Sequence, residues 1–413
     1  MLRMTQDFPI SRRTVTKSAL LGSAALLSGA GGRAHADSRA THAPLAPGNC
    51  VLTLPAPTGR HPVGCKSIYL VDASRRDPWD PEFPVRELIL TVFYPARDTI
   101  GLARAPQLPP LAASAFADIV SFTPLQLPGV GVDWGGTMSH SFQGAAARPG
   151  RWPVLVYSPG GGDPRGLGTS LAEDLASHGA VVVAVDHPGD AVAVEFPDVT
   201  TFRHDQVRTT VLRGDPRDQP RVFRTMIDAR IADLRFVLGR LRHAAGLPLP
   251  PGLSDALDLR RMGVYGHSAG GSAVAEVLYE DQRVRAGINL EGYLDYPPTA
   301  ADGAVEPFPV AAEGTDRPLL LLGSEGFSRG QELDRSWSAV AAASGRWVRS
   351  ARIADANHWI FADYAVMVPQ LQMAGLMTAA SRDTLIGAID PAVSVPEIRH
   401  VVRGFFARHL ATC

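Results

Sequence analysis

The hydrophobic positions of the chain fall into short continuous runs separated by longer segments with helical spacing. Continuous apolar runs of this length predict strands that are buried on both faces of a sheet. The runs are 152–157, 180–185, 262–265, 285–290, 317–323 and 347–353, and the segments with helical character are 167–177, 222–241, 272–279 and 396–410. Strands that alternate with helices predict an α/β fold with a mostly parallel central sheet and helices on both faces.

The part of the chain before residue 152 has a different pattern. Residues 51–54, 66–72 and 86–94 are rich in β-forming residues and separated by turns, which predicts antiparallel strands at one edge of the sheet. Residues 97–149 are expected to be irregular, with a short apolar helix at 111–122. A loop of this length is often functional. A substrate cover and a plain surface excursion are both open interpretations of it.

The first 36 residues have the pattern of an export signal. Arg12 and Arg13 precede an apolar small-residue run over 19–30, and Ala34-His35-Ala36 fits a cleavage site. Paired arginines of this kind predict a Tat signal cleaved after Ala36, with the Tat machinery as partner and a secreted or periplasmic product. Residues 37–48, rich in Ala, Pro and Ser, are expected to be disordered, which leaves one catalytic domain over 49–413.

Charge and cysteine content narrow the function classes. Forty basic and 41 acidic residues give no signature of nucleic-acid binding, and no later apolar run predicts a membrane span.

The three cysteines are Cys50, Cys65 and Cys413. A Cys50–Cys65 disulfide is one interpretation, while Cys413 could instead pair with either one or stay free. Their spacing indicates no metal site, and the oligomeric state is left open.

The pentapeptide Gly266-His-Ser-Ala-Gly270 is the strongest chemical motif. It lies between an apolar strand and a small-residue helix, the context of a nucleophile elbow, which predicts Ser268 as the nucleophile. A plain glycine-rich turn is the alternative. One donor of an oxyanion hole should be the N–H of Ala269, and the second should come from the glycine triplet 160–162 after an early strand.

The partners of this serine are predicted from chain order. Serine, acid and histidine follow one another in α/β-hydrolases, each beyond the end of a strand. His358 follows the last predicted strand, and two acids compete: Glu291 ends the strand after the elbow unit, and Glu325 ends the next one. Either carboxylate could orient the imidazole and stabilise its charged form.

At this point the chain resembles the platelet-activating-factor acetylhydrolase family of the plasma and isoform-II type, together with its bacterial relatives. The resemblance spans roughly 52–365 and rests on several collinear motifs. They include Leu54-Pro-Ala-Pro-Thr-Gly59, Asp72-Ala-Ser-Arg75, Tyr157-Ser-Pro-Gly-Gly161, Asp186-His187, Gly287-Ile-Asn-Leu-Glu291, Ser324-Glu325 and Phe361-Ala-Asp363. Bacterial polyester hydrolases and lipases are the next most similar group.

The resemblance implies roles for particular residues. In the family the acid follows the G-I-x-L strand, which maps onto Glu291, although the family usually has Asp there; Glu325 remains the second candidate. The oxyanion donor of the loop maps onto Gly161. The implied substrates are phospholipids with short or oxidised acyl chains.

The sequence therefore predicts a secreted serine esterase that uses no cofactor or metal and acts on small-molecule or lipid esters. A polyester or triglyceride hydrolase is the alternative on the same fold. A non-catalytic binding protein whose pocket is occluded by residues 97–149 is an alternative of another class. A metal-dependent hydrolase built on Asp186, His187 and Asp190 is the third alternative.

Overall fold

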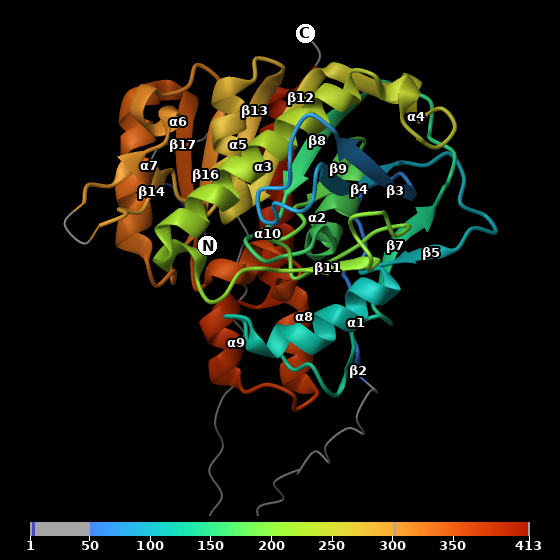
Figure 1. The fold of residues 1–413 in the computed structure, drawn as a ribbon, viewed down its shortest axis with the longest axis horizontal. Coiled ribbons are helices and arrows are strands. Elements are labelled where there is room, and N and C mark those ends of the chain that lie inside the picture. Colours follow the sequence, from blue (N-terminus) through green and yellow to red (C-terminus); the bar gives the residue numbers. More distant parts are fainter. Residues whose placement is uncertain (1, 5–49, 301–302, 412–413) are drawn as a thin grey trace, which may run out of the picture.

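The computed structural model describes residues 2–4, 50–300 and 303–411, and its main feature is one large twisted sheet (Figure 1). Eleven strands of the described residues form this sheet. In their order across the sheet they are β1 Leu2–Met4, β17 Val348–Ile353, β16 Leu319–Ser324, β13 Val284–Leu290, β12 Leu257–His267, β8 Trp152–Ser158, β9 Val181–Asp186, β4 Arg86–Pro95, β3 Val63–Asp72, β7 Met138–Gln143 and β5 Arg104–Pro106.

The strand directions confirm the expected fold class. Strands β17, β16, β13, β12, β8 and β9 run parallel to one another, whereas β1 pairs antiparallel with β17, and β4 pairs antiparallel with both β9 and β3. Because parallel strands need crossover connections, the segments between them return over the faces of the sheet as helices. The result is a mostly parallel sheet with an antiparallel N-terminal edge, as the sequence predicts.

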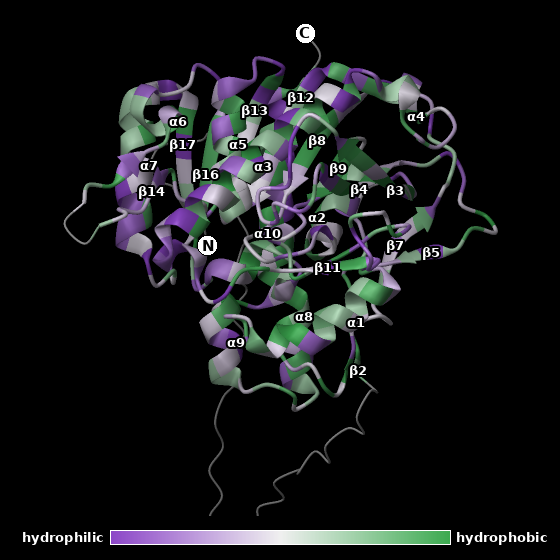
Figure 2. Cartoon of the chain, in the orientation of Figure 1, coloured by the Kyte–Doolittle hydropathy of each residue, from purple (hydrophilic) through white to green (hydrophobic). Residues whose placement is uncertain are grey.

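Helices cover both faces of the sheet (Figure 1). On one face lie α3 Pro220–Leu241, α5 Ala269–Glu280, α6 Pro309–Glu313 and α7 Gly330–Ser344, and on the other lie α2 Thr169–Ser177, α8 Tyr364–Met373 and α10 Pro391–His409. Alternate residues of one strand serve the two cores: Val154 and Val156 pack with α3 and α5, and Leu155 and Tyr157 pack with α2 and α10. This explains the continuous apolar runs in the sequence, which Figure 2 shows as hydrophobic strands at the centre.

The remaining elements are short and lie outside these layers. The helices are α1 Pro110–Ile119, α4 Leu253–Ala256 and α9 Ala379–Ile386, with 3₁₀ turns η1 Val120–Phe122, η2 Arg165–Gly168, η3 Pro216–Asp218, η4 Ala244–Gly246, η5 Gly345–Trp347 and η6 His358–Phe361. Three two-stranded pairs are formed by β2 Cys50–Val51 with β6 Val132–Asp133, β10 Ala193–Glu195 with β11 Val207–Thr209, and β14 Asp295–Tyr296 with β15 Glu306–Pro307.

The segment 97–149 is more regular than the sequence predicts. The expected helix is present as α1 and η1, but β7 and β5 also extend the main sheet beyond β3. Strand β7 was missed because its buried positions are serines rather than apolar residues. One of them, Ser141, donates a 2.5 Å hydrogen bond to Glu173, which satisfies its hydroxyl inside the protein.

Two further expectations about the N-terminal part are wrong. Cys50 and Cys65 are both buried free thiols, because Cys50 pairs with Val132 of β6 while Cys65 lies within β3, which pairs with β4. Burial raises the pKa of the Cys65 thiol to about 12, so it stays protonated. The strand expected at 51–54 ends at Val51, and Thr53 instead bonds to the side chain of Gln370.

Several predictions about the two ends of the chain lie outside the described residues. They are the twin-arginine motif, the cleavage site after Ala36, the linker 37–48 and Cys413. The described residues 2–4 form β1, which pairs with β17. Among the described residues, no helix combines the length and the apolar character that crossing a membrane requires.

Helix α5 packs so closely on β8 that a glycine is required at Gly270. A Cβ added there would lie 2.0 Å from the carbonyl oxygen of Ser158 and 2.5 Å from that of Pro159. We expect Gly270→Ala to lower the free energy of unfolding by about 2 kcal/mol or more, because rigid backbone atoms must move. Gly239→Ala, in α3 with open space around it, should raise that energy by about 0.5–1 kcal/mol. Urea denaturation of both variants would check this, and equal stabilities would contradict the close packing.

Candidate active site

Ser268 stands at a strained turn between β12 and α5. Its φ of 52° and ψ of −122° are rare for a residue with a side chain, and its N–H donates a 2.8 Å hydrogen bond to the carbonyl of Leu290. Gly266 and Gly270 allow this turn, because a Cβ at Gly266 would lie 2.4 Å from the backbone of Gly270. The Ser268 side chain is partly exposed, as a nucleophile elbow requires.

His358 and Glu291 form a direct contact. His358 opens η6 after β17, and Glu291 follows β13, so both lie at the carboxyl ends of parallel strands, as Ser268 does. The Nδ1 of His358 lies 2.9 Å from Oε2 of the fully buried Glu291. Because a carboxylate accepts, Nδ1–H donates, which leaves Nε2 as the unprotonated nitrogen of the neutral ring.

The carboxylate of Glu291 is fixed by Ser324 at the end of β16. The hydroxyl of Ser324 donates to Oε1 at 2.8 Å, and its backbone N–H donates to the same oxygen. Glu291 itself has a φ of 61°, a strained conformation that persists only where surrounding structure enforces it. The competing acid, Glu325, has an exposed side chain beyond the end of β16. Of the two acids, the structure therefore brings Glu291 onto the histidine.

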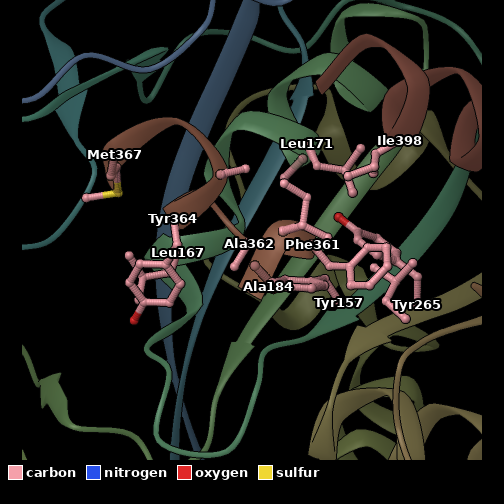
Figure 3. Close-up of a cluster of buried hydrophobic side chains, with 14 of the residues drawn as sticks. Tyr157, Leu167, Leu171, Ala184, Tyr265, Phe361, Ala362, Tyr364, Met367 and Ile398 are labelled. Atoms are coloured by element: carbon pink, nitrogen blue, oxygen red, sulfur yellow. The ribbon is translucent and has the colours of Figure 1, made fainter. Parts of the chain in front are cut away.

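Aromatic rings surround His358. The Phe327 ring stacks on the imidazole with centroids 4.6 Å apart and planes 18° apart. Behind the turn, Phe361 lies beside the strand residues Tyr157 and Tyr265, as Figure 3 shows. These contacts hold the 3₁₀ turn that carries His358 against the sheet.

His267, the second residue of the pentapeptide, also holds this turn. Its Nε2 lies 3.0 Å from the carbonyl oxygen of His358, so Nε2 carries the proton and donates. Burial is the main cause that lowers the pKa of His267, which keeps the ring neutral. The motif therefore contributes a support for the histidine turn as well as the serine.

The two expected oxyanion donors are the backbone N–H groups of Ala269 and Gly161. Ala269 opens α5, whose N-terminal end favours negative charge, and Gly161 follows β8. Within the described residues, neither N–H has a hydrogen-bond acceptor. A Cβ at Gly161 would lie 3.6 Å from the Ala269 side chain, so the two backbones approach closely. Both groups are thus free to receive a ligand oxygen.

Arg230 of α3, which the sequence analysis missed, fixes the loop before Gly161. Its fully buried guanidinium donates to the carbonyl oxygens of Pro159 at 2.5 Å and of Gly160 at 2.9 Å, and it also reaches the hydroxyl of Ser158 at 3.2 Å. The signal was present in the sequence, because position 230 lies on the apolar face of the helical pattern between Ile227 and Leu234.

Asp190 completes this arrangement from the other side of Gly161. Its carboxylate accepts a hydrogen bond from Nε–H of Arg230 at 2.5 Å and another from the backbone N–H of Gly162 at 2.8 Å. The ion pair compensates two charges that would otherwise be buried alone. Arg230 and Asp190 therefore hold the loop on both sides of the oxyanion donor, which we call the Arg230–Asp190 clamp.

The residues of the metal-site alternative all have protein partners. Asp186 pairs with Arg165, Asp190 with Arg230, and His187 lies between the Ser158 hydroxyl at 2.9 Å and Asp233 at 3.0 Å. Their nitrogen and oxygen atoms are thus engaged in ion pairs and hydrogen bonds within the protein at the end of β9. Among the described residues, no group of His, Cys, Asp and Glu could hold a metal ion. Although Ser158, His187 and Asp233 have the residue types and distances of a catalytic triad, all three are fully enclosed.

A pocket of about 350 Å³, which we call the serine pocket, opens at the predicted site. Ser268, His358, Gly161 and Ala269 all line it, whereas Glu291 lies behind His358. Polar and charged residues form much of the remaining lining, including Asp215, Arg217, Ser328, Arg329, Asn357 and Thr384. The segment 97–149, for which a substrate cover and a surface excursion are both open interpretations of the sequence, contributes Pro124 to the wall and leaves Ser268 accessible.

The arrangement of a serine elbow with a histidine and an acid on later strand ends, all on a mostly parallel sheet, defines the α/β-hydrolase class. A family model described as platelet-activating factor acetylhydrolase, isoform II, matches residues 48–211 and 251–411. The chain therefore belongs to this family, as the sequence motifs indicate.

Three relatives illustrate the similarity. A probable 1-alkyl-2-acetylglycerophosphocholine esterase of Arthroderma benhamiae is 30% identical over 261 residues, which are 62% of this chain and 59% of that protein. The platelet-activating factor acetylhydrolase of Bos taurus is 27% identical over 206 residues, 43% of this chain and 41% of that protein. The match thus spans less than two thirds of either relative's length. The solved structure of a ferulic acid esterase from Streptomyces cinnamoneus has a TM-score of 0.63 and 34% identity, over 87% of this chain and 93% of that one.

Asp363, just after the histidine turn, generates a pH prediction. It accepts hydrogen bonds from Ser170 at 2.5 Å and Gln107 at 2.8 Å, and burial raises its pKa to about 7. Between about pH 4 and pH 7 the folded protein keeps a proton that the unfolded chain has lost, so this group makes stability fall as the pH rises. Asp363→Asn should flatten that fall. Urea midpoints measured from pH 4.5 to 7.5 would check it, and parallel curves for the two proteins would contradict it.

Proposed function

We propose that this chain is a serine hydrolase of carboxylic esters, with Ser268 as nucleophile, His358 as general base and Glu291 as the acid of the triad. The observation that carries the proposal is the 2.9 Å contact between the buried Glu291 and His358, which lines the same pocket as the strained Ser268. Membership of an acetylhydrolase family supports the same reaction class.

The proposed reaction has two halves. His358 Nε2 takes the proton of Ser268 as its Oγ attacks the ester carbonyl carbon, and the N–H groups of Gly161 and Ala269 bind the negative oxygen. The tetrahedral intermediate collapses, the C–O bond to the alcohol breaks, and His358 gives its proton to that alcohol. Water then attacks the acyl-enzyme by the same route and releases the carboxylic acid. Glu291 stabilises the imidazolium in both halves.

Export by the Tat route and action outside the cytoplasm are part of the proposal and rest on the first 36 residues. For the substrate, the names of the relatives indicate esters of lipid alcohols and of an aromatic acid. The charged and polar residues of the serine pocket, among them Arg217 and Arg329, favour a polar alcohol as the leaving group. A polyester or triglyceride hydrolase is the alternative of the same class. A non-catalytic binding protein is less well supported, because Ser268 is accessible in an open pocket.

Ser268→Ala tests the reaction class. We expect turnover of p-nitrophenyl butyrate to fall by about 10⁴-fold or more, since the nucleophile and its base act as a unit. A fluorophosphonate probe should add one covalent adduct to the parent protein and none to the variant, as seen by mass spectrometry. Ser338→Ala, an exposed serine on α7, is the control and should keep full activity. Hydrolysis by the Ser268 variant at the parent rate would refute the proposal.

The choice of acid has its own test. Glu291→Gln keeps the shape of the side chain but removes the charge that stabilises the imidazolium, so kcat should fall by about 10³–10⁴-fold. Glu325→Gln, one strand away and exposed, is the matched control and should change kcat by less than about threefold. The reverse order of the two effects would assign the triad acid to Glu325.

A further inference from the structure

A second pocket, of about 290 Å³, adjoins the serine pocket and takes no part in the mechanism above. We call it the side pocket. The two pockets share five lining residues: Pro124, Gly161, Asp163, Pro216 and Trp359. Because Gly161 is among them, the side pocket borders the place where the carbonyl oxygen of an ester would bind.

The side pocket has an apolar wall, although Thr123, Asp163, Thr209, Thr210 and Arg213 also line the pocket. One wall comes from α1, η1 and the following turn, through Phe116, Ile119, Val120, Phe122 and Leu125. Val192, Leu212 and Trp359 line it from other parts of the chain. Figure 2 shows α1 in mainly hydrophobic colours, and Phe122 is 86% exposed. An exposed phenylalanine at the edge of an apolar pocket indicates a surface that a ligand can cover.

The chemistry of the reaction determines which half of the ester each pocket can hold. The carbonyl carbon carries the alcohol on one side and the acyl chain on the other. The alcohol must lie next to His358, because His358 protonates it as it leaves. His358 lines the serine pocket but not the side pocket. The side pocket is therefore on the acyl side of the carbonyl.

We propose that the side pocket binds the acyl group of the substrate, and that this group is apolar and has about six or more carbons, linear or aromatic. The volume supports the size, since a cavity of about 150 Å³ lined by apolar side chains holds a benzene ring. An acetyl group would leave most of the 290 Å³ unfilled. The proposal rests on the serine-hydrolase function and specifies which esters that site prefers.

Rates on esters with one alcohol and different acyl groups test the proposal. The probes are p-nitrophenyl acetate, octanoate and 3-phenylpropanoate, so that linear and aromatic chains are separate arms. In the parent protein, kcat/KM should rise from acetate to at least one of the longer esters, by roughly fourfold for each methylene that becomes buried. Activity that is highest on acetate and falls steadily with acyl size would overturn the proposal.

Two variants locate the effect in the side pocket. Ile119→Trp fills it, and we expect kcat/KM for the preferred long ester to fall about tenfold or more while the acetate changes by less than twofold. Phe122→Ala removes an exposed side chain at little cost to folding, and it should lower the long-ester rate several-fold with acetate again unchanged. Leu111→Trp, on the exposed face of the same helix, is the matched control and should behave as the parent does.

The controls separate this proposal from the general function. A panel of acetate esters with different alcohols should give the same relative rates in Ile119→Trp and in the parent, because the alcohol side is untouched. A variant effect that followed the alcohol rather than the acyl group would overturn the assignment. If Ser268→Ala is inactive and acyl length has no effect, the side-pocket proposal alone fails. If Ser268→Ala keeps its activity, the serine-hydrolase function itself fails.

Discussion

The hydrogen bonds that Arg230 donates to the loop after β8 constrain the geometry of the whole site. In a trans peptide the carbonyl and the N–H point in opposite directions. Since Arg230 holds the Gly160 carbonyl at 2.9 Å, the N–H of Gly161 in the same peptide must point to the other side, toward the pocket. A cation on the carbonyl also polarises the amide and strengthens its N–H as a donor. The Arg230–Asp190 clamp therefore prepares the site before any ligand arrives, in the sense that electrostatic preorganisation requires.

A second constraint concerns the acid. A glutamate is one methylene longer than an aspartate, so its backbone must sit differently for the carboxylate to reach the same imidazole nitrogen. In this protein the backbone of Glu291 has a left-handed φ of 61°, and Ser324 holds the far oxygen of the carboxylate. The hydrogen bonds to the carboxylate offset the conformational free energy that the left-handed backbone of Glu291 costs.

Much of the fold could be predicted from the sequence, and the reasons are local. Strands such as β8 and β9 are apolar up to their last residue because both faces are covered, and Ser268 and His358 follow from glycine spacing and chain order. The prediction failed where a buried position is polar. Strand β7 buries serines and α3 buries Arg230, and in each case the partner that permits the burial lies far away in the chain. The contact that distinguishes Glu291 from Glu325 is likewise a property of the assembled sheet. No part of the sequence could show that Cys50 and Cys65 lie in different strand pairs.

The position of the side pocket in the chain has a consequence for how such enzymes diversify. Its outer wall is built by residues 116–125, which precede β8 and the other central parallel strands and contribute neither to the elbow nor to the histidine turn. Point changes, insertions or deletions in that stretch can reshape the wall while the reaction centre keeps its geometry. Sequence changes in this peripheral segment can therefore alter the range of substrates. Relatives with the same reaction centre need not share a substrate.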